Sequence, residues 1–127
     1  MLLIGLREIR SQNSWMHNSP TLMKGPRRQS ARVHPDDAAE VGVPDGGAVR
    51  IVSRHGAIEV AITITDEVGP GTVAVPHGWG HHGGWRMANA SGGTNVNRLT
   101  SSDTADLEIL AGMTLLNGVA VRLEACS

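Results

Sequence analysis

The sequence predicts a mainly β fold, a small barrel of short strands, on three observations. Short runs that are apolar, or that alternate between apolar and polar residues, recur between turn signals. Only residues 35–42 carry the start and stop signals of a helix, so the regular strand–helix alternation of an α/β sheet is not expected. Two long polar stretches interrupt the strands, which indicates long loops on a compact barrel.

The expected strands are, in chain order, residues 2–6, 31–33, 48–54, 57–65, 72–75 and 117–124. The clearest two form a hairpin that turns at His55 and Gly56. The second strand of the hairpin puts four branched side chains on one face, as a half-buried strand requires: Ile58, Val60, Ile62 and Ile64.

The predicted helix begins after His34. Pro35 suits the first helical position, and two aspartates follow it, where a helix N-terminus favours negative charge. Gly42 suits the position that stops the helix. The sequence Pro-Asp-Gly-Gly at residues 44–47 then predicts a turn into the next strand.

Composition and charge limit the classes of protein to consider. The 127 residues suit one domain, and with no Phe or Tyr its core must be aliphatic, helped by three tryptophans. A net charge of −1 argues against a general nucleic-acid binder, which needs a basic surplus. The single cysteine, Cys126, cannot form an internal disulfide and is interpreted as an ordinary terminal thiol. No stretch has the apolar length of a membrane span or a signal peptide, so we expect a cytoplasmic protein without membrane insertion.

Two polar loops hold the candidate ligand-binding residues. The first polar loop, residues 7–20, follows the first strand with Arg7, Arg10, Ser11, Asn13 and Ser14. Guanidinium groups pair with phosphate oxygens, and amide side chains suit the edge of a pterin or purine. The second polar loop, residues 77–104, adds the short polar side chains of Asn89, Ser91, Thr94, Asn95 and Asn97. Its two tryptophans, Trp79 and Trp85, argue against simple disorder of this loop. Any one of these residues alone reads as a solvated turn residue, whereas two such loops together favour a shared ligand site.

Other chemistries are less well supported. His77, His81 and His82 offer imidazoles to a metal, but no carboxylate lies near them and the intervening glycines leave the geometry loose, so an ordinary Gly/His loop is favoured. The signatures G-x-S-x-G and H-E-x-x-H are absent, as are the Walker A and G-x-G-x-x-G nucleotide motifs.

Three stretches, taken in order, resemble a known family: REIRSQNSWMHN, then VHPDDAAEVGVPDGGAVRIVSRHGAIEVAITITDEVGPGTVAVPHGWG, then NVNRLTSSDTADLE with NGVAVRLEA. They resemble the C-terminal molybdopterin-dinucleotide-binding domain of the dimethyl sulfoxide reductase superfamily of molybdenum/tungsten oxidoreductases, and most of all its formate-dehydrogenase-like members. The resemblance implies a six-stranded double-psi β-barrel, related to aspartate decarboxylase, with one or two short helices and long polar loops. It also implies that residues 1–127 are a single domain, a fragment of a larger chain.

The implied function is to bind molybdopterin guanine dinucleotide as a cap on the parent enzyme. The remaining domains of that oxidoreductase would be the partners and would hold the molybdenum or tungsten. This piece would be inactive alone, and the isolated domain would hold no cofactor. The resemblance assigns the chain no catalytic residue and no metal ligand.

The implied cofactor-binding residues fall in the two polar loops. By position they are Arg7, Ser11, Asn13 and Ser14 in the first loop, with His77, Trp79 and Asn97 in the second. We therefore expect Asn13 and Asn97 at the same end of the barrel. Trp15 could cover the ligand or anchor the barrel wall, and we expect the anchor because the core has few aromatics.

Two alternatives use the same barrel. A self-contained enzyme like aspartate decarboxylase would need a Gly-Ser pair for self-cleavage, and the sequence has none. A barrel that binds a protein or another ligand would show a strongly apolar or charged groove without converging Asn, Ser and Arg side chains.

Overall fold

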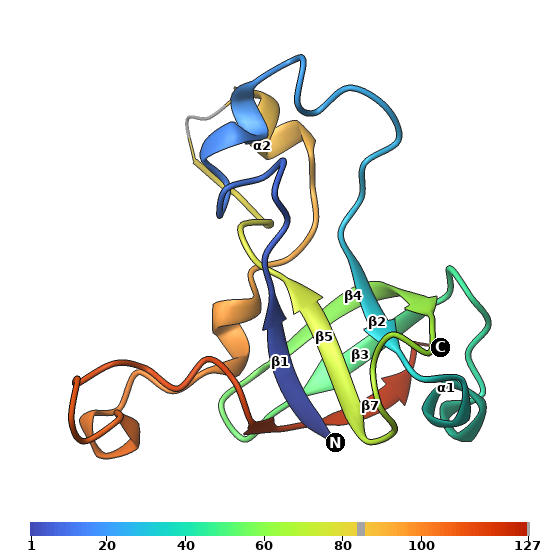
Figure 1. Ribbon diagram of the computed structural model, residues 1–127, viewed down its shortest axis with the longest axis vertical. Helices are drawn as coiled ribbons and strands as arrows, with labels where there is room; N and C mark the ends of the chain where they lie inside the picture. The colour runs from blue at the N-terminus through green and yellow to red at the C-terminus, as the bar shows by residue number, and fades with distance from the viewer. Residues whose placement is uncertain (84–85, 127) are drawn as a thin grey trace.

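The computed structural model describes residues 1–83 and 86–126, and it shows a mainly β molecule built on one curled sheet (Figure 1). Within these residues seven strands pair in the order β6-β1-β5-β2-β4-β3-β7. The strands are β1 (Leu2–Leu6), β2 (Ser30–Val33), β3 (Ala48–Val52), β4 (Ala57–Ile64), β5 (Thr72–Pro76), β6 (Val119–Ala120) and β7 (Arg122–Ala125). The predicted mainly β class is confirmed.

Strand pairing is largely non-local. β1 pairs in parallel with β5, and β2 pairs in parallel with β4, while the other neighbours are antiparallel. The last predicted strand is divided in two, because Val121 separates β6 from β7 and these two lie at opposite ends of the strand order. The backbone of Val121 exchanges two hydrogen bonds with the backbone of Met1, each 3.0 Å long. These bonds fix the residue that separates β6 from β7.

The core is aliphatic, as the absence of Phe and Tyr requires. Ile58, Val60 and Ile62 of β4 are buried, whereas Ile64 is only partly buried where the strand ends. The rest of the core comes mainly from the other central strands, with two residues from the second polar loop: Leu3, Ala31, Val33, Val49, Ile51, Val73, Val75, Val96 and Leu99. The second polar loop is therefore fastened to the barrel at Val96 and Leu99.

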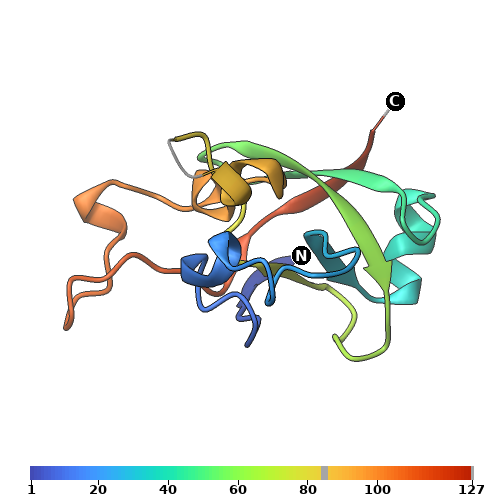
Figure 2. The same cartoon turned by 90° about the horizontal axis from the view of Figure 1, so that it is seen from above.

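The helices are short. α1 (Pro35–Val41) forms as predicted, with the His34 ring accepting the Asp36 N–H and Gly42 ending the helix at a φ of 74°. α2 (Arg86–Ala90) was not predicted; it lies inside the second polar loop and packs against the 3₁₀ helix η1 (Trp15–Asn18) of the first loop (Figures 1 and 2). Two further 3₁₀ helices are η2 (Val96–Leu99) and η3 (Thr104–Asp106). None of the helices in the described residues is long and apolar enough to cross a membrane. Trp85, one of the tryptophans used to argue for order, lies outside the described residues.

Candidate functional site: a groove at the ends of two parallel strands

A groove lies where the first and second polar loops leave the sheet. Since β1 and β5 are parallel, their carboxyl ends meet at one edge, and the His77 N–H donates to the Leu6 carbonyl at 3.0 Å. The groove has a volume of about 340 Å³. Its lining comes from the first loop at Arg7, Asn13 and Ser14, from the second loop at residues 77–81, Asn95 and Asn97, and from Leu116.

Six of the seven residues assigned by resemblance line this one groove: Arg7, Asn13, Ser14, His77, Trp79 and Asn97. Asn13 and Asn97 therefore lie at the same end of the molecule, as expected. The exception is Ser11, which is buried and whose hydroxyl oxygen accepts the Ser14 N–H at 3.2 Å. Ser11 thus holds the shape of the first loop from beneath, and its assignment as a ligand contact stays a prediction.

Two glycines let the loops approach each other closely. Gly78 has a φ of 83°, and a Cβ built on it would lie 2.6 Å from the Ser14 nitrogen. Gly80 has a φ of 78°, and its Cβ would lie 2.5 Å from the Asn95 nitrogen. Both positions therefore need glycine for the left-handed backbone and for the absence of a side chain. The segment between them is held between the first loop on one side and residues 94–95 on the other.

The first loop is strained where it enters the groove. Gln12, Asn13 and Ser14 have φ angles of 45°, 53° and 88°, although none is glycine. Asparagine tolerates this region, whereas glutamine and serine rarely adopt it. Such strain persists only where the surrounding structure fixes it, and it concentrates at ligand-binding sites.

A buried amide fixes the second loop. The Gln29 Nε2 donates to the carbonyls of Pro76 and Thr94 at 2.9 and 3.0 Å, and its Oε1 accepts the Thr94 N–H at 2.7 Å. Gln29 is 5% exposed, so these three bonds join the end of β5 to the loop that carries Asn95 and Asn97. Sequence reasoning missed Gln29, because a glutamine before a short strand has no distinctive signal.

Trp79 forms the floor of the groove. Its side chain is buried, and its indole N–H donates to Glu8 Oε2 at 3.0 Å, while Arg27 lies 3.5 Å from the same carboxylate oxygen. The His17 ring packs against Trp79 with 4.6 Å between ring centroids. Glu8 and Arg27 were not among the predicted residues, although the buried indole needs a hydrogen-bond acceptor such as Glu8.

Arg7 is the arginine that lines the groove, and the pKa values of two histidines, His77 in the groove and His17 beneath it, are lowered by their surroundings. Burial, and then the nearby Arg7 guanidinium, lower the pKa of His77 below its ordinary value of 6.5. Burial also lowers the pKa of His17, and His81 and Arg27 lower it further against a smaller opposing effect of Glu8. The groove therefore presents the guanidinium of Arg7, the imidazole of His77, amides and backbone N–H groups, a set that suits a phosphorylated heterocycle.

The three histidines of the second loop do different things. His77 faces the groove, the His81 Nε2 donates to the Gly78 carbonyl at 2.9 Å, and His82 is exposed. Among the described residues, no group of three His, Cys, Asp or Glu side chains is placed to hold a metal.

Trp15 is not an anchor of the barrel wall. Its side chain is 84% exposed, on the outer side of η1, while His17 of the same turn is buried. The expectation was wrong because Trp79 already fills the wall position beside His17. Trp15 instead lines a separate hollow of about 430 Å³ with Ser14, Asn18, His81 and Ala88.

The sequence family is settled by comparison with known proteins. Residues 1–114 match the model of the family described as the molydopterin dinucleotide binding domain. The chain belongs to this family. Its relatives place it in the dimethyl sulfoxide reductase superfamily, so the resemblance read from the sequence is confirmed for the superfamily and for its cofactor class, a molybdopterin dinucleotide.

Two curated relatives are reductases. The chain is 30% identical over 126 residues to the arsenate respiratory reductase molybdopterin-containing subunit of Chrysiogenes arsenatis, covering 93% of this chain and 15% of that protein. It is 38% identical over 58 residues to trimethylamine-N-oxide reductase of Haemophilus influenzae, covering 46% of this chain and 6% of that protein. The chain therefore spans a small part of the length of these relatives.

A solved structure has the same fold. Acetylene hydratase from Pelobacter acetylenicus matches 99% of this chain and 18% of its own, with a TM-score of 0.82 and 24% sequence identity. Nearly all of this chain thus has a counterpart inside a much longer chain.

Proposed function

We propose that the groove holds part of a molybdopterin guanine dinucleotide, and that this domain is the cap over that cofactor in a molybdenum or tungsten oxidoreductase. The observation that carries the proposal is the convergence of Arg7, Asn13, His77 and Asn97 on one groove. These residues come from two loops far apart in the sequence. Convergent Asn, Ser and Arg side chains also disfavour the alternative, a barrel that binds a protein or another ligand.

The chemistry of the groove fits the proposed ligand. The Arg7 guanidinium would bind a phosphate of the dinucleotide in a charge-assisted pair, and Asn13, Asn95 and Asn97 would bind ring edges through their amides. Neutral His77 can donate one hydrogen bond and accept another without adding charge. Once bound in the parent enzyme, the cofactor supplies the sulfur ligands of the metal and carries the redox chemistry. This chain supplies binding and orientation.

Several finer expectations stay predictions of the same proposal. The chain would be a fragment of a larger oxidoreductase, inactive and without cofactor when isolated. A formate-dehydrogenase-like parent and a cytoplasmic location are further predictions; the reported relatives are reductases of arsenate and trimethylamine-N-oxide. The six-stranded double-psi barrel is supported by the place of β6 and β7 at the two ends of the strand order, one residue apart.

The test removes one guanidinium at a time from the oxidoreductase that carries this domain. Arg7→Ala takes away the only arginine that lines the groove in the described residues, whereas Arg10→Ala removes the same charge from an exposed position of the same loop that does not line it. We expect Arg7→Ala to lower the bound guanine nucleotide and metal per protein at least several-fold, and Arg10→Ala to leave both near the wild-type level. Acid release of guanosine monophosphate and metal analysis by mass spectrometry measure the two contents.

A second variant separates the groove from general damage to the loop. Asn97→Ala should also lower the cofactor content, while Arg98→Ala, next to it on η2 but outside the groove, should not. Equal cofactor content in all four variants would contradict the proposal. Equal losses in all four would show that the loops matter only for folding, and would also contradict it.

A further inference from the structure

Exposed apolar side chains of the described residues are concentrated in one short arm, residues 107–116. Five large aliphatic side chains of this arm are 37–96% exposed: Ile109, Leu110, Met113, Leu115 and Leu116. Figures 1 and 2 both show the arm in orange and red, projecting from the molecule on the side away from α1. Single exposed apolar residues are ordinary, but such a concentration marks an interaction site.

The arm has a defined shape of its own. Leu107 and Thr114 pair in an antiparallel bridge, the Glu108 N–H donates to the Met113 carbonyl at 2.8 Å, and the Gly112 N–H donates to the Glu108 carbonyl at 2.8 Å. The Glu108 carboxylate accepts the N–H groups of Leu110 and Ala111, and these bonds lower its pKa. Glu108 is the only charged residue of the arm, and its carboxylate is turned toward the backbone N–H groups of the turn. Ile109 and Leu110 at the tip carry aliphatic side chains that are 96% and 94% exposed.

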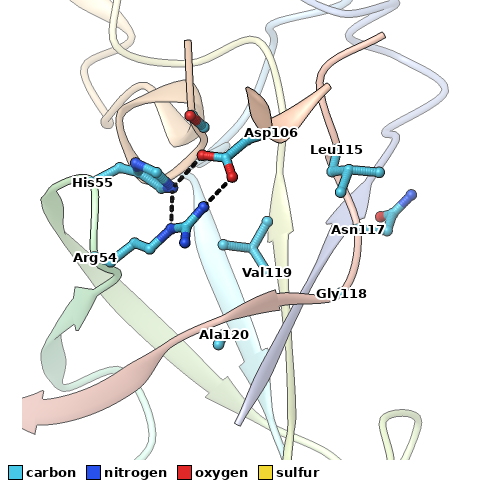
Figure 3. A pocket seen from close by; sticks show the side chains of 9 residues that line it. Arg54, His55, Asp106, Leu115, Asn117, Gly118, Val119 and Ala120 are labelled. Carbon is cyan, nitrogen blue, oxygen red and sulfur yellow. Dashed lines mark hydrogen bonds and ion pairs between the residues drawn. The ribbon is translucent and has the colours of Figure 1, made fainter. Parts of the chain in front are cut away.

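Both ends of the arm are tied to the barrel. Figure 3 shows Asp106, just before the arm, facing Arg54 and His55 at the turn between β3 and β4. Asp106 pairs with Arg54, and its other oxygen lies 3.8 Å from the His55 Nε2. Beyond the arm, the Asn117 Oδ1 accepts the Gly5 N–H at 2.7 Å and the Gly118 N–H donates to the Leu3 carbonyl at 2.8 Å. The arm therefore projects in a fixed direction.

The arm also reaches the candidate site. Leu116 lines the groove beside Asn97, so a surface that covers the arm also lies over one side of the groove. The chain corresponds to only 15% of the arsenate reductase subunit and 18% of acetylene hydratase, which leaves most of such an enzyme outside residues 1–127. An arm with a defined shape and an apolar tip, next to the groove, fits an apolar hollow on that larger body.

We propose that the arm docks into an apolar hollow of the remaining domains of the parent polypeptide, and that this contact closes the groove over the cofactor. The inference rests on the proposed function, because it takes the groove to be the cofactor site. It adds the surface through which the cap is held and the chemistry of its partner. Ile109 and Leu110 are the docking residues, and the Arg54–Asp106 pair is the positioning contact.

Cross-linking in the full-length oxidoreductase tests the docking directly. A benzophenone amino acid replaces Leu110, and a matched one replaces Ala39, an exposed residue of α1 on the other side of the molecule. After irradiation we expect the label at 110 to join an apolar peptide of the same polypeptide outside residues 1–127, and the label at 39 not to join that peptide. A cross-link from 110 to a second copy of the chain, or no protein cross-link from 110, would overturn the inference.

A charge at the tip gives an independent readout. Leu110→Glu should speed the loss of metal and guanine nucleotide from the purified holoenzyme several-fold on dilution, with Ala39→Glu as the control that adds the same charge elsewhere. Unchanged loss rates would refute the closing role. The two proposals fail separately: if Arg7→Ala empties the site but position 110 labels a second copy, only the docking is wrong. If position 110 labels the enzyme body but Arg7→Ala keeps the cofactor, only the groove assignment is wrong.

Discussion

The His77 ring occupies the space that a side chain on Gly5 would need. A Cβ built on Gly5 would lie 2.1 Å from the His77 Nε2 and 2.7 Å from its Cε1. Gly5 belongs to β1 and His77 follows β5, so the parallel pairing of these two strands brings the ring over the glycine. The absence of a side chain at one strand end thus sets the position of an imidazole in the groove.

Gly5→Ala should move His77 without unfolding the protein. The clashing atoms are the far end of a side chain, so the ring can turn away, and we expect the free energy of unfolding to change by less than about 1.5 kcal/mol. The ring signals of His77 in an NMR spectrum should shift, and cofactor content in the parent enzyme should fall. His77→Ala removes the obstacle, so adding Gly5→Ala to that variant should have little further effect. Additive effects of the two substitutions would contradict the contact.

Gly80→Ala should destabilise the chain more than Gly42→Ala. Both glycines have positive φ, at 78° and 74°, so each substitution meets the left-handed penalty of about 1–2 kcal/mol. At Gly80 the Cβ would also press on the backbone of residues 94–95, whereas at Gly42 nothing lies within 4 Å. We expect a further loss of about 1–3 kcal/mol at Gly80, measured by urea unfolding. Equal losses would mean that the two loops do not meet as described.

Gln29→Met should weaken both stability and the order of the second loop. The substitution keeps the length of the side chain but leaves the Thr94 N–H and the Pro76 and Thr94 carbonyls without their partner. We expect a loss of about 1–3 kcal/mol in urea unfolding, and faster amide hydrogen exchange at residue 94. Glu40→Met places the same side chain at an exposed position of α1 and serves as the control; it should have little effect on either measurement.

The chain should lose stability on mild acidification. The pKa values of His17 and His77 lie below their ordinary 6.5, so the unfolded chain binds more protons than the folded one near that pH. The free energy of unfolding should then be at its full value above about pH 7 and fall as the pH drops through 6.5. His17→Leu should flatten this fall. It should cost little at neutral pH, because in the described residues neither ring nitrogen of His17 has a hydrogen-bond partner to lose.

Replacing exposed His82 by leucine is the matched control for His17→Leu. That variant should keep the pH dependence of the wild-type chain. A slope that stays the same after His17→Leu would show that His17 does not titrate differently in the folded and unfolded chains.

Local structure was predicted well where neighbouring residues decide it. The hairpin of β3 and β4 follows from alternation around His55 and Gly56, and α1 follows from Pro35 and Gly42, whose roles depend on their own backbone angles. Strand order could not be predicted in this way, since β1 pairs with β5 and β6 through contacts between distant residues. α2 was missed because a five-residue helix within a polar loop has no room for a hydrophobic period.

The sequence identified site residues by the chemistry of their side chains, but it could not predict whether each side chain faces the groove or the interior of a loop. Arg7, Asn13 and Asn97 were identified because their side chains suit the ligand, and all three reach the groove. Ser11 has equally suitable chemistry, yet its hydroxyl is used inside the loop. Trp15 was misplaced because the turn of η1 directs His17 inward instead. The correct and the wrong assignments differ in whether the side chain is buried, and burial depends on the packing of two loops that are distant in the sequence.

The pairing of β1 with β6, which ends just before Val121, affects how the chain folds during its synthesis. Residue 2 of β1 pairs with residues 72 and 120, so both neighbours of β1 are synthesised after it, the second of them much later than the first. At a synthesis rate of roughly 5–20 residues per second, the apolar face of β1 waits on the order of ten seconds for that partner. During translation Leu3 is therefore accessible to chaperones and to misfolding until β6 has been synthesised.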